Sequence, residues 1–361
     1  MSMFFKVRPI TKIEELHGEG HRRVVKLLKE NVEAGIFTAL LGPRRVGKTS
    51  ILRVFLNEYD YKFLYYDLSP FIGRFGVSYL ELTPAIINVD PKDLSYRAQL
   101  SLGIVRLDVK PESSIRFQNE LINLLRELNS KYENVLLVID EAQVMPRIRG
   151  LNMLGVLQLI SNTLDNVTVI MTGSMPGLLE KVLNPSASQP MFSRYVDKIH
   201  VERWTLEESV EYLKRGFKEE GVPFSEPELE EAAEELSNVP GFLAYYGIAR
   251  VRGLSHEKAL EEASEHAVRV WEKDLEAFLT VYNSRAYVTI LSLIASSKFG
   301  ISRREILNEV RRREDISERS VTRILHNLVM SGMVVRRSGK YFIPERPLAK
   351  AILRVAGRHR S

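Results

Sequence analysis

The amino-acid sequence predicts an α/β protein: a three-layer core with a parallel sheet, followed by an all-helical segment and a winged helix. In the first 200 residues, apolar runs that end in small or acidic residues alternate with helical patterns, which is typical of a parallel sheet covered by helices. Helical patterns without strand signals follow Trp204. Beyond Arg285, three helical patterns precede an alternating segment around Ser338-Gly339, which indicates a β-hairpin.

The stretch from Gly42 to Thr49 has the spacing of a phosphate-binding loop, a glycine and four residues before Gly-Lys-Thr. A strand-like apolar run at 35–41 precedes it and a helical pattern follows, so phosphates would lie at a helix N-terminus. Gly42 and Gly47 let backbone N–H groups turn inward around an anion. Lys48 is expected to reach the outer phosphates, and the Thr49 hydroxyl to bind the Mg²⁺ that bridges them. This context favours a nucleotide site over a chance glycine-rich turn.

Two arginines, Arg44 and Arg45, lie inside this loop, although the phosphate cradle does not require them. Two interpretations are open. They are solvated charges of an exposed loop, or they face the element that closes over the nucleotide.

The run at 134–143, in which five apolar residues end in Asp140-Glu141, supplies a second motif. It predicts a central strand of a parallel sheet with two carboxylates at the sheet edge where ligands bind. Asp140 is then expected to hold Mg²⁺ and Glu141 to deprotonate the attacking water; the alternative is a pair of surface carboxylates. The interval between Lys48 and Asp140 leaves room for one more strand, at 61–68.

The nucleotide is predicted to be ATP, with ADP as the product. The tandem Asp-Glu is not typical of nucleotide kinases and GTPases, and the guanine-recognition motif Asn-Lys-x-Asp does not occur in the sequence.

A further buried strand is predicted at 166–174, and parallel packing would place Ser174 beside Glu141. Its hydroxyl either hydrogen-bonds the γ-phosphate or the attacking water, the role called sensor 1, or it simply caps the strand.

Composition bounds the remaining chemistry. The 361 residues suffice for two or three domains with their own cores. The chain has no cysteine, which excludes disulfides, thiolate catalysis and cysteine-ligated metals. No apolar run approaches the ~18 residues of a membrane span, and the N-terminus lacks a signal-peptide pattern, so a cytoplasmic protein without membrane contact is expected.

Charge is distributed unevenly. Residues 285–361 carry 17 Lys and Arg against 6 Asp and Glu, whereas the remaining 284 residues carry 34 against 40. A basic segment of this kind predicts an anionic partner. Between Trp204 and Arg285, capping boxes at Thr205/Glu208 and Ser225/Glu228 begin a small helical bundle, whose glutamate-rich faces are expected to be solvated.

Helices beginning at Ser302 and Ser317 and the hairpin predict a winged helix in the basic segment. Its third helix presents basic side chains at i, i+4 and i+7, as in a DNA recognition helix, and others lie on the wing, where phosphate contacts are usual. The candidate DNA contacts are Arg319, Arg323, His326, Arg336, Arg337 and Lys340. The alternative is a winged helix that binds a protein partner or a second copy of this chain.

Together these motifs resemble the AAA+ superfamily and, within it, the archaeal ATPase family of STAND-class P-loop NTPases. The resemblance rests on GPRRVGKTSIL, LLVIDEAQ, VIMTGS and VPGFLAYYG and spans about residues 17–346. It implies a nucleotide-binding core at 1–203, a helical lid at 204–284 and a winged-helix domain at 285–361.

The resemblance also implies functional residues. Nucleotide contacts would come from the loop and from a prolyl residue in the lid: Gly42, Pro43, Arg44, Arg45, Val46, Gly47, Lys48, Thr49, Ser50 and Pro240. Arg194 lies where the family carries an arginine, so it is either an arginine finger or sensor that stabilises charge on the γ-phosphate, or a surface arginine. Lys48, Glu141, Ser174 and Arg194 are thus the catalytic candidates, and Thr49 and Asp140 the metal ligands.

The motifs favour an ATP-binding and ATP-hydrolysing regulatory switch, with slow or regulated turnover, whose winged helix contacts DNA. Two alternatives are a replication-initiator-like DNA-binding ATPase and a transcription factor that senses nucleotide without significant turnover. A ring motor is disfavoured because no sensor-2 arginine or pore loop is evident. Residues 69–111 match no motif and are interpreted either as an insertion that covers the site or as a partner surface.

Overall fold

The computed structural model describes residues 3–74, 76–82, 84–95, 114–183, 195–282 and 284–358. The chain forms two compact units. The core unit comprises Thr11–Gly42 and Lys48–Val201, and the C-terminal unit comprises Met1–Ile10, Pro43–Gly47 and Glu202–Ser361. The three-part division at 203 and 284 stays a prediction.

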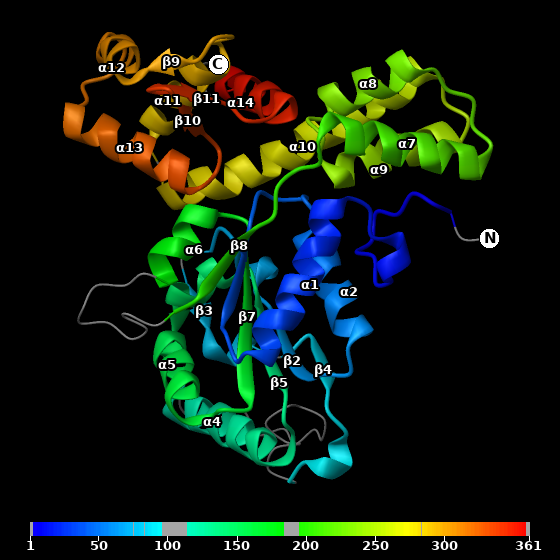
Figure 1. The fold of residues 1–361 in the computed structure, drawn as a ribbon. Helices are drawn as coiled ribbons and strands as arrows, with labels where there is room; N and C mark the ends of the chain where they lie inside the picture. Colours follow the sequence, from blue (N-terminus) through cyan, green and yellow to red (C-terminus); the bar gives the residue numbers. More distant parts are fainter. Residues whose placement is uncertain are drawn as a thin grey trace. The chain divides into compact units, whose positions relative to one another are not determined.

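The core unit is built on a six-stranded sheet of strand order β4-β2-β5-β7-β1-β8 (Figure 1). Its strands are β1 (Thr38–Leu41), β2 (Lys62–Asp67), β4 (Ile86–Asn88), β5 (Val135–Asp140), β7 (Val167–Gly173) and β8 (Asp197–His200). β4 is antiparallel to β2, and the other pairs are parallel. Every residue of β5 and β7 is buried, as expected for parallel strands that are covered on both faces.

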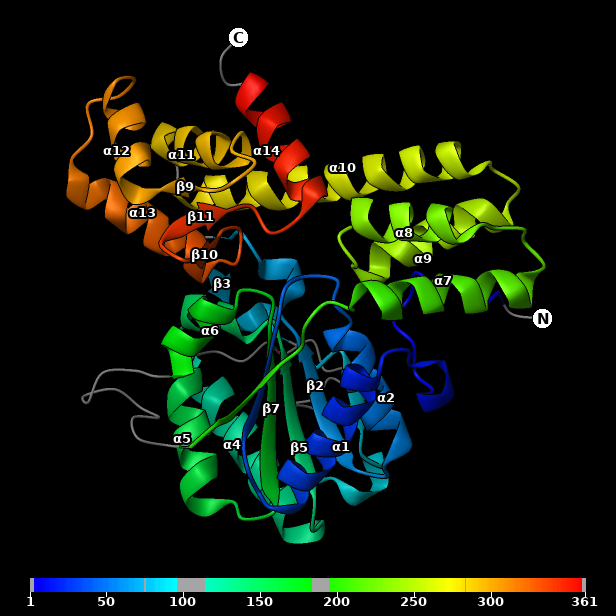
Figure 2. The same cartoon turned by 45° about the horizontal axis from the view of Figure 1, so that its top comes forward.

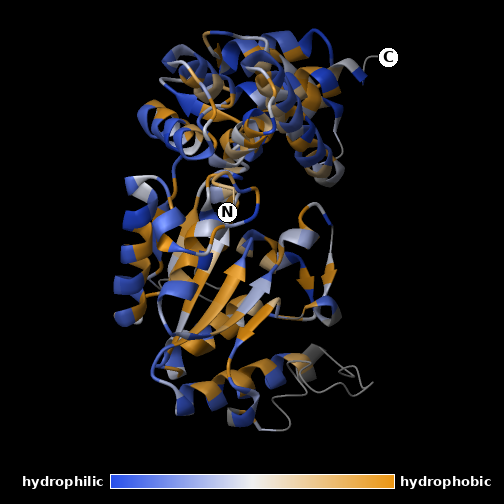
Figure 3. Ribbon diagram, turned by 90° about the vertical axis from the view of Figure 1, so that its right-hand side faces the viewer, coloured by the Kyte–Doolittle hydropathy of each residue, from blue (hydrophilic) through white to orange (hydrophobic). Residues whose placement is uncertain are grey.

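Helices cover the two faces of this sheet and give the three layers that the sequence predicts. α1 (Glu19–Glu33) and α2 (Lys48–Glu58) lie on one face, whereas α4 (Ser114–Lys131), α5 (Met153–Thr163) and α6 (Pro176–Leu183) lie on the other (Figures 1 and 2). Apolar side chains of α4, α5 and α6 form one buried cluster with alternate strand residues. Hydropathy follows the same layering, with hydrophobic strands and hydrophilic outer helix surfaces (Figure 3).

The strand predicted at 61–68 is present as β2, but it pairs with β5 on the side away from β1. The strand between β1 and β5 is β7. The phosphate loop follows β1, and the carboxylates Asp140 and Glu141 lie at the end of β5, so the segment after β7 lies between the loop and the carboxylates.

Part of the segment that matches no motif belongs to this unit. It contains β3 (Val77–Ser78), which pairs with β6 (Ile148–Arg149), and the edge strand β4. Residues 96–113 lie outside the described part of the chain.

The C-terminal unit is mainly helical. Its first helices are α7 (Leu206–Glu220), α8 (Glu226–Glu235), α9 (Pro240–Val251) and α10 (His256–Tyr282). These are followed by α11 (Arg285–Ala295), β9 (Ile301–Ser302), α12 (Arg303–Arg311), α13 (Glu318–Met330), β10 (Val335–Arg337), β11 (Lys340–Phe342) and α14 (Arg346–Arg358). The three short strands form an antiparallel sheet. The predicted capping boxes begin α7, α8 and α12.

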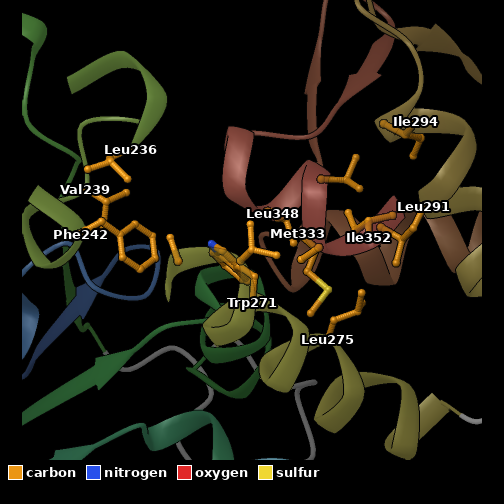
Figure 4. Packing of buried hydrophobic residues seen from close by; sticks show 14 of the residues in the cluster. Leu236, Val239, Phe242, Trp271, Leu275, Leu291, Ile294, Met333, Leu348 and Ile352 are labelled. Atoms are coloured by element: carbon orange, nitrogen blue, oxygen red, sulfur yellow. The ribbon is translucent and has the colours of Figure 1, made fainter. Parts of the chain in front are cut away.

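A single hydrophobic core runs through the C-terminal unit, from Phe5 to Val355. The long helix α10 joins its parts, because Trp271 and Leu275 pack with Leu348 of α14 in the same cluster (Figure 4). The segment 204–284 and the segment 285–361 therefore share buried apolar surface rather than forming two separate cores.

Candidate functional site

The phosphate loop connects β1 to α2 with the backbone geometry that its glycines permit. Gly42 donates its N–H to the Gly173 carbonyl at 3.3 Å. A Cβ at Gly42 would lie 2.3 Å from the Val201 carbonyl oxygen, so only glycine fits there. Gly47 has a φ of 103°, which favours glycine. The buried Lys48 ammonium donates to the Gly42 carbonyl at 2.7 Å, so it is already directed along the loop.

Asp140 ends β5 and accepts hydrogen bonds from three hydroxyl groups of the core unit. Thr49 at the start of α2 lies 3.4 Å from Oδ2, and Tyr65 of β2 donates to the same oxygen at 2.6 Å. Thr172 of β7 donates to Oδ1. The predicted pair of metal ligands, Thr49 and Asp140, is thus side by side.

The charge state of Asp140 depends on what occupies the site. Burial raises the pKa of its carboxyl, and the two stronger hydroxyl contacts act against that rise. The carboxylates of Glu141 and Asp67 raise the pKa further. A divalent cation would favour the ionised form, and adjacent hydroxyl and carboxylate oxygens are ligands that Mg²⁺ accepts. The residues present therefore fit Mg²⁺.

Glu141 follows β5 in a left-handed backbone conformation, with φ 59° and ψ 45°, which is uncommon for a residue with a side chain. Its Oε2 accepts hydrogen bonds from the Ser174 N–H at 3.1 Å and the Ser174 hydroxyl at 2.6 Å. Gln143 Nε2 donates to the same oxygen. The register of β5 and β7 thus brings Ser174 to Glu141, as the sequence predicts.

Three residues of this cluster are absent from the sequence prediction: Tyr65, Thr172 and Gln143. Gln143 follows Glu141 by two residues, and its Nε2 also lies 3.4 Å from the Ser174 hydroxyl. Its Oε1 is buried and has no hydrogen-bond partner among the described residues. Reversing the amide would place that oxygen against the Glu141 carboxylate, so the orientation with Nε2 toward Glu141 is the favourable one.

The middle of the phosphate loop, Pro43–Gly47, belongs to the C-terminal unit. Arg44 forms an ion pair with Asp274 of α10. The Arg45 guanidinium lies 5.4 Å from the centre of the Phe242 ring of α9. Both arginines therefore contact helices of the C-terminal unit, Arg44 half-buried and Arg45 exposed, and both interpretations of these residues stay open.

The other predicted nucleotide contacts lie where the motifs place them. Val46 is fully buried in the loop and Ser50 is in the first turn of α2. Pro240 is the first residue of α9, and the next residue, Gly241, faces Arg45. Arg194 lies outside the described residues.

The predicted DNA contacts are all exposed side chains. Arg319, Arg323 and His326 lie on α13, and Arg336, Arg337 and Lys340 on the β10–β11 hairpin. Arg336 also lies over the Tyr341 ring, at 5.7 Å.

Several other cations of the basic segment are paired with acidic side chains, so part of the glutamate-rich helix faces forms ion pairs in addition to being solvated. The α14 pairs are Arg346–Glu234, Lys350–Glu235, Arg354–Glu265 and Arg358–Glu272. Within the described part of the chain, no ion pair involves Arg319, Arg323, Arg336 or Arg337. Exposed positive charge without an acidic partner therefore lies on α13 and the hairpin.

The sheet and the phosphate loop of the core unit give a P-loop fold of the AAA+ type. Residues 33–182 match the family model described as an AAA domain, so the AAA+ resemblance of the motifs is confirmed. The chain is similar to the Walker-type ATPase PABY2304 of Pyrococcus abyssi, with 26% identity, a TM-score of 0.76, and coverage of 97% of this chain and 100% of that one.

Similarity of fold alone extends to the ORC2 protein of Aeropyrum pernix, whose structure is described as ADPNP-ADP complexes. It is 13% identical, with a TM-score of 0.59 over 98% of this chain and 96% of that one. A comparison with curated proteins found no match. In the described residues, every helix is too short or too polar to cross a membrane.

Proposed function

We propose that the protein is an ATP-hydrolysing regulatory switch whose C-terminal segment is a winged helix that contacts DNA. The observation that carries this proposal is the cluster of Lys48, Thr49, Asp140 and Glu141 at the C-terminal ends of β1 and β5 in the core unit. The AAA domain match and the similarity to a Walker-type ATPase support ATP as the nucleotide.

Magnesium-bound ATP supplies the bond to be cleaved and a Lewis acid that offsets charge on the phosphate oxygens. Lys48 would exchange the Gly42 carbonyl for an outer phosphate oxygen, and Thr49 and Asp140 would hold the metal. These residues bind and orient, and position and electrostatics provide most of the catalysis of phosphoryl transfer.

Glu141 is the proposed general base, which takes a proton from the attacking water. Ser174 donates two hydrogen bonds to one oxygen of this carboxylate and thereby orients the Glu141 side chain. Its hydroxyl is also proposed for the sensor-1 role, a hydrogen bond to the γ-phosphate or to the attacking water. Arg194 is proposed to stabilise charge on the γ-phosphate.

A switch works only to the extent that ATP binds one arrangement of the protein better than another. The proposed output is the exposure of α13 and the hairpin to DNA, which the unpaired arginines on these elements support. Turnover is proposed to be slow or regulated, since the base is held by several donors before any substrate is bound.

The test is an ATPase assay on separated oligomeric fractions, with and without duplex DNA. Multiple turnovers that Glu141→Gln removes would support the proposal. ATP binding without turnover in the wild-type protein would instead favour a nucleotide-sensing transcription factor. Turnover without DNA binding at low salt would leave a switch whose winged helix faces a protein.

A further inference from the structure

The phosphate loop is linked to α10 by an ion pair that the phosphate cradle does not need. Arg44 and Asp274 form this pair, and their side chains are only 26% and 16% exposed. Partial burial reduces solvent screening, so the pair is stronger than one on an open surface. A change in the conformation of the loop therefore acts on α10 through this contact.

A second contact joins the loop to α9. Arg45 adopts a left-handed backbone conformation, with a φ of 65°, and its guanidinium lies over the buried ring of Phe242. Such a cation–π contact attracts the guanidinium to the face of the ring. The two adjacent arginines thus hold two different helices of the C-terminal unit.

The same region of α10 contacts a buried carboxyl group, Glu345, which directly precedes α14. Glu345, which is 3% exposed, accepts a hydrogen bond from Trp271 Nε1 at 2.7 Å and from Arg203 Nη2 at 2.8 Å. Trp271 and Asp274 are three residues apart on α10, so they lie on neighbouring turns. Burial raises the pKa of Glu345, and the charge and hydrogen bond of Arg203 and the hydrogen bond of Trp271 act against this rise, with a smaller effect of the Arg45 charge.

We propose that Arg44 and Arg45 are coupling residues, which transmit the nucleotide state of the phosphate loop to α10 and, through Glu345, to the start of α14. This inference rests on the proposed function, since it names how the switch is relayed. It explains why a loop that binds phosphate through backbone N–H groups and Lys48 carries two additional arginines: their guanidinium groups are directed to the C-terminal unit.

The experiment is hydrogen exchange of the full chain, with and without Mg·ATP, in peptides from two regions. Peptides of β5 and α2 report nucleotide binding, and peptides that contain Asp274 or Glu345 report the relay. In the wild-type protein both sets are expected to exchange more slowly with Mg·ATP, the relay peptides by about fivefold or more, the lower end of usual coupling between sites. Asp274→Asn, which leaves every residue of the phosphate loop unchanged, should keep the response of the first set and lose that of the second.

A charge exchange makes the test specific. The double variant Arg44→Asp, Asp274→Arg should recover at least part of the relay response, because the pair is re-formed in reverse. Arg215→Ala, which breaks an exposed ion pair with Glu219 on α7, is the matched control and should respond as the wild type does.

The possible outcomes distinguish a failure of nucleotide binding from a failure of the relay. If wild-type peptides of β5 and α2 do not respond to Mg·ATP, nucleotide binding fails and the relay with it. If they respond and the relay peptides of Asp274→Asn respond as strongly as in the wild type, the relay alone is overturned. A relay response that is lost in Asp274→Asn and not recovered by the charge exchange would also overturn the pairing.

Discussion

Replacing Gln143 with leucine is expected to slow ATP turnover while leaving the core unit folded. Gln143 donates through Nε2 to Glu141, whereas its own Oε1 is buried without a partner among the described residues. Leucine is of similar size and lacks both polar atoms. The substitution therefore removes a useful hydrogen bond and an unsatisfied acceptor together.

These two losses have opposite effects on the free energy of unfolding. A hydrogen bond to a charged group contributes about 1.5–3 kcal/mol, and a buried unsatisfied polar group costs about 1–3 kcal/mol. The stability of the folded protein should consequently change by no more than about 2 kcal/mol in either direction. No such compensation applies to Glu141, which keeps Ser174 as a donor but loses the Gln143 amide. If most of the free energy of this hydrogen bond serves to orient the base in the transition state, kcat should fall by about tenfold to 100-fold. KM should not change.

The assay pairs steady-state phosphate release with chemical denaturation of the same protein. Ser174→Ala is the companion variant, because it removes the hydroxyl donor at 2.6 Å and keeps the backbone N–H; it should also lower kcat at constant KM. A rise in turnover in Gln143→Leu would refute the reasoning, since it would show that Gln143 restrains the base. A loss of more than about 3 kcal/mol of stability would show that the residue is structural.

Three further predictions follow from the same geometry. Lys48→Ala should abolish ATP binding in a fluorescent-nucleotide titration, whereas Glu141→Gln should bind ATP and lose turnover by about 100-fold or more; wild-type turnover in Glu141→Gln would contradict the assignment of the base. Gly42→Ala should lower the free energy of unfolding by about 1–3 kcal/mol, because the new Cβ meets a backbone carbonyl at 2.3 Å, and unchanged thermal unfolding would contradict this contact. Arg337→Ala should weaken binding of the full chain to all duplex sequences, whereas Arg323→Ala should cost about 1–3 kcal/mol at particular base pairs; equal losses on every sequence would remove Arg323 from base recognition.

The nucleotide half of the fold could be predicted because its signals are local. A parallel strand that is buried on both faces must be a continuous apolar run, so β5 and β7 are visible in the sequence. The polar residues that end such strands meet at one sheet edge, which is why Ser174 could be expected beside Glu141. The strand between β1 and β5 was less predictable, since order along the chain does not give order across the sheet.

The residues that hold these carboxylates could not be predicted in the same way. Tyr65 lies in an apolar strand, where its ring has the same pattern as any core aromatic, and only the neighbouring position of β2 and β5 brings its hydroxyl to Asp140. Gln143 is one polar residue in a short turn. Its hydrogen bonds depend on the left-handed conformation of Glu141, which no local pattern indicates.

The basic segment shows why charge balance in a sequence overestimates an interface. Its net charge counts the cations of α14, yet four of them are paired with glutamates of α8 and α10. Only cations without such partners can bind phosphates and release counterions from DNA without first breaking an ion pair. Five cations of α13 and the hairpin meet this condition among the described residues: Arg319, Arg323, Arg336, Arg337 and Lys340. If each makes one phosphate contact, log K should fall with log salt concentration with a slope of about −4.5. Titration of fluorescent duplex with the full chain at several salt concentrations measures this slope. A much steeper dependence would require the α14 cations to leave their glutamates, and a slope near zero would mean that this surface does not bind DNA.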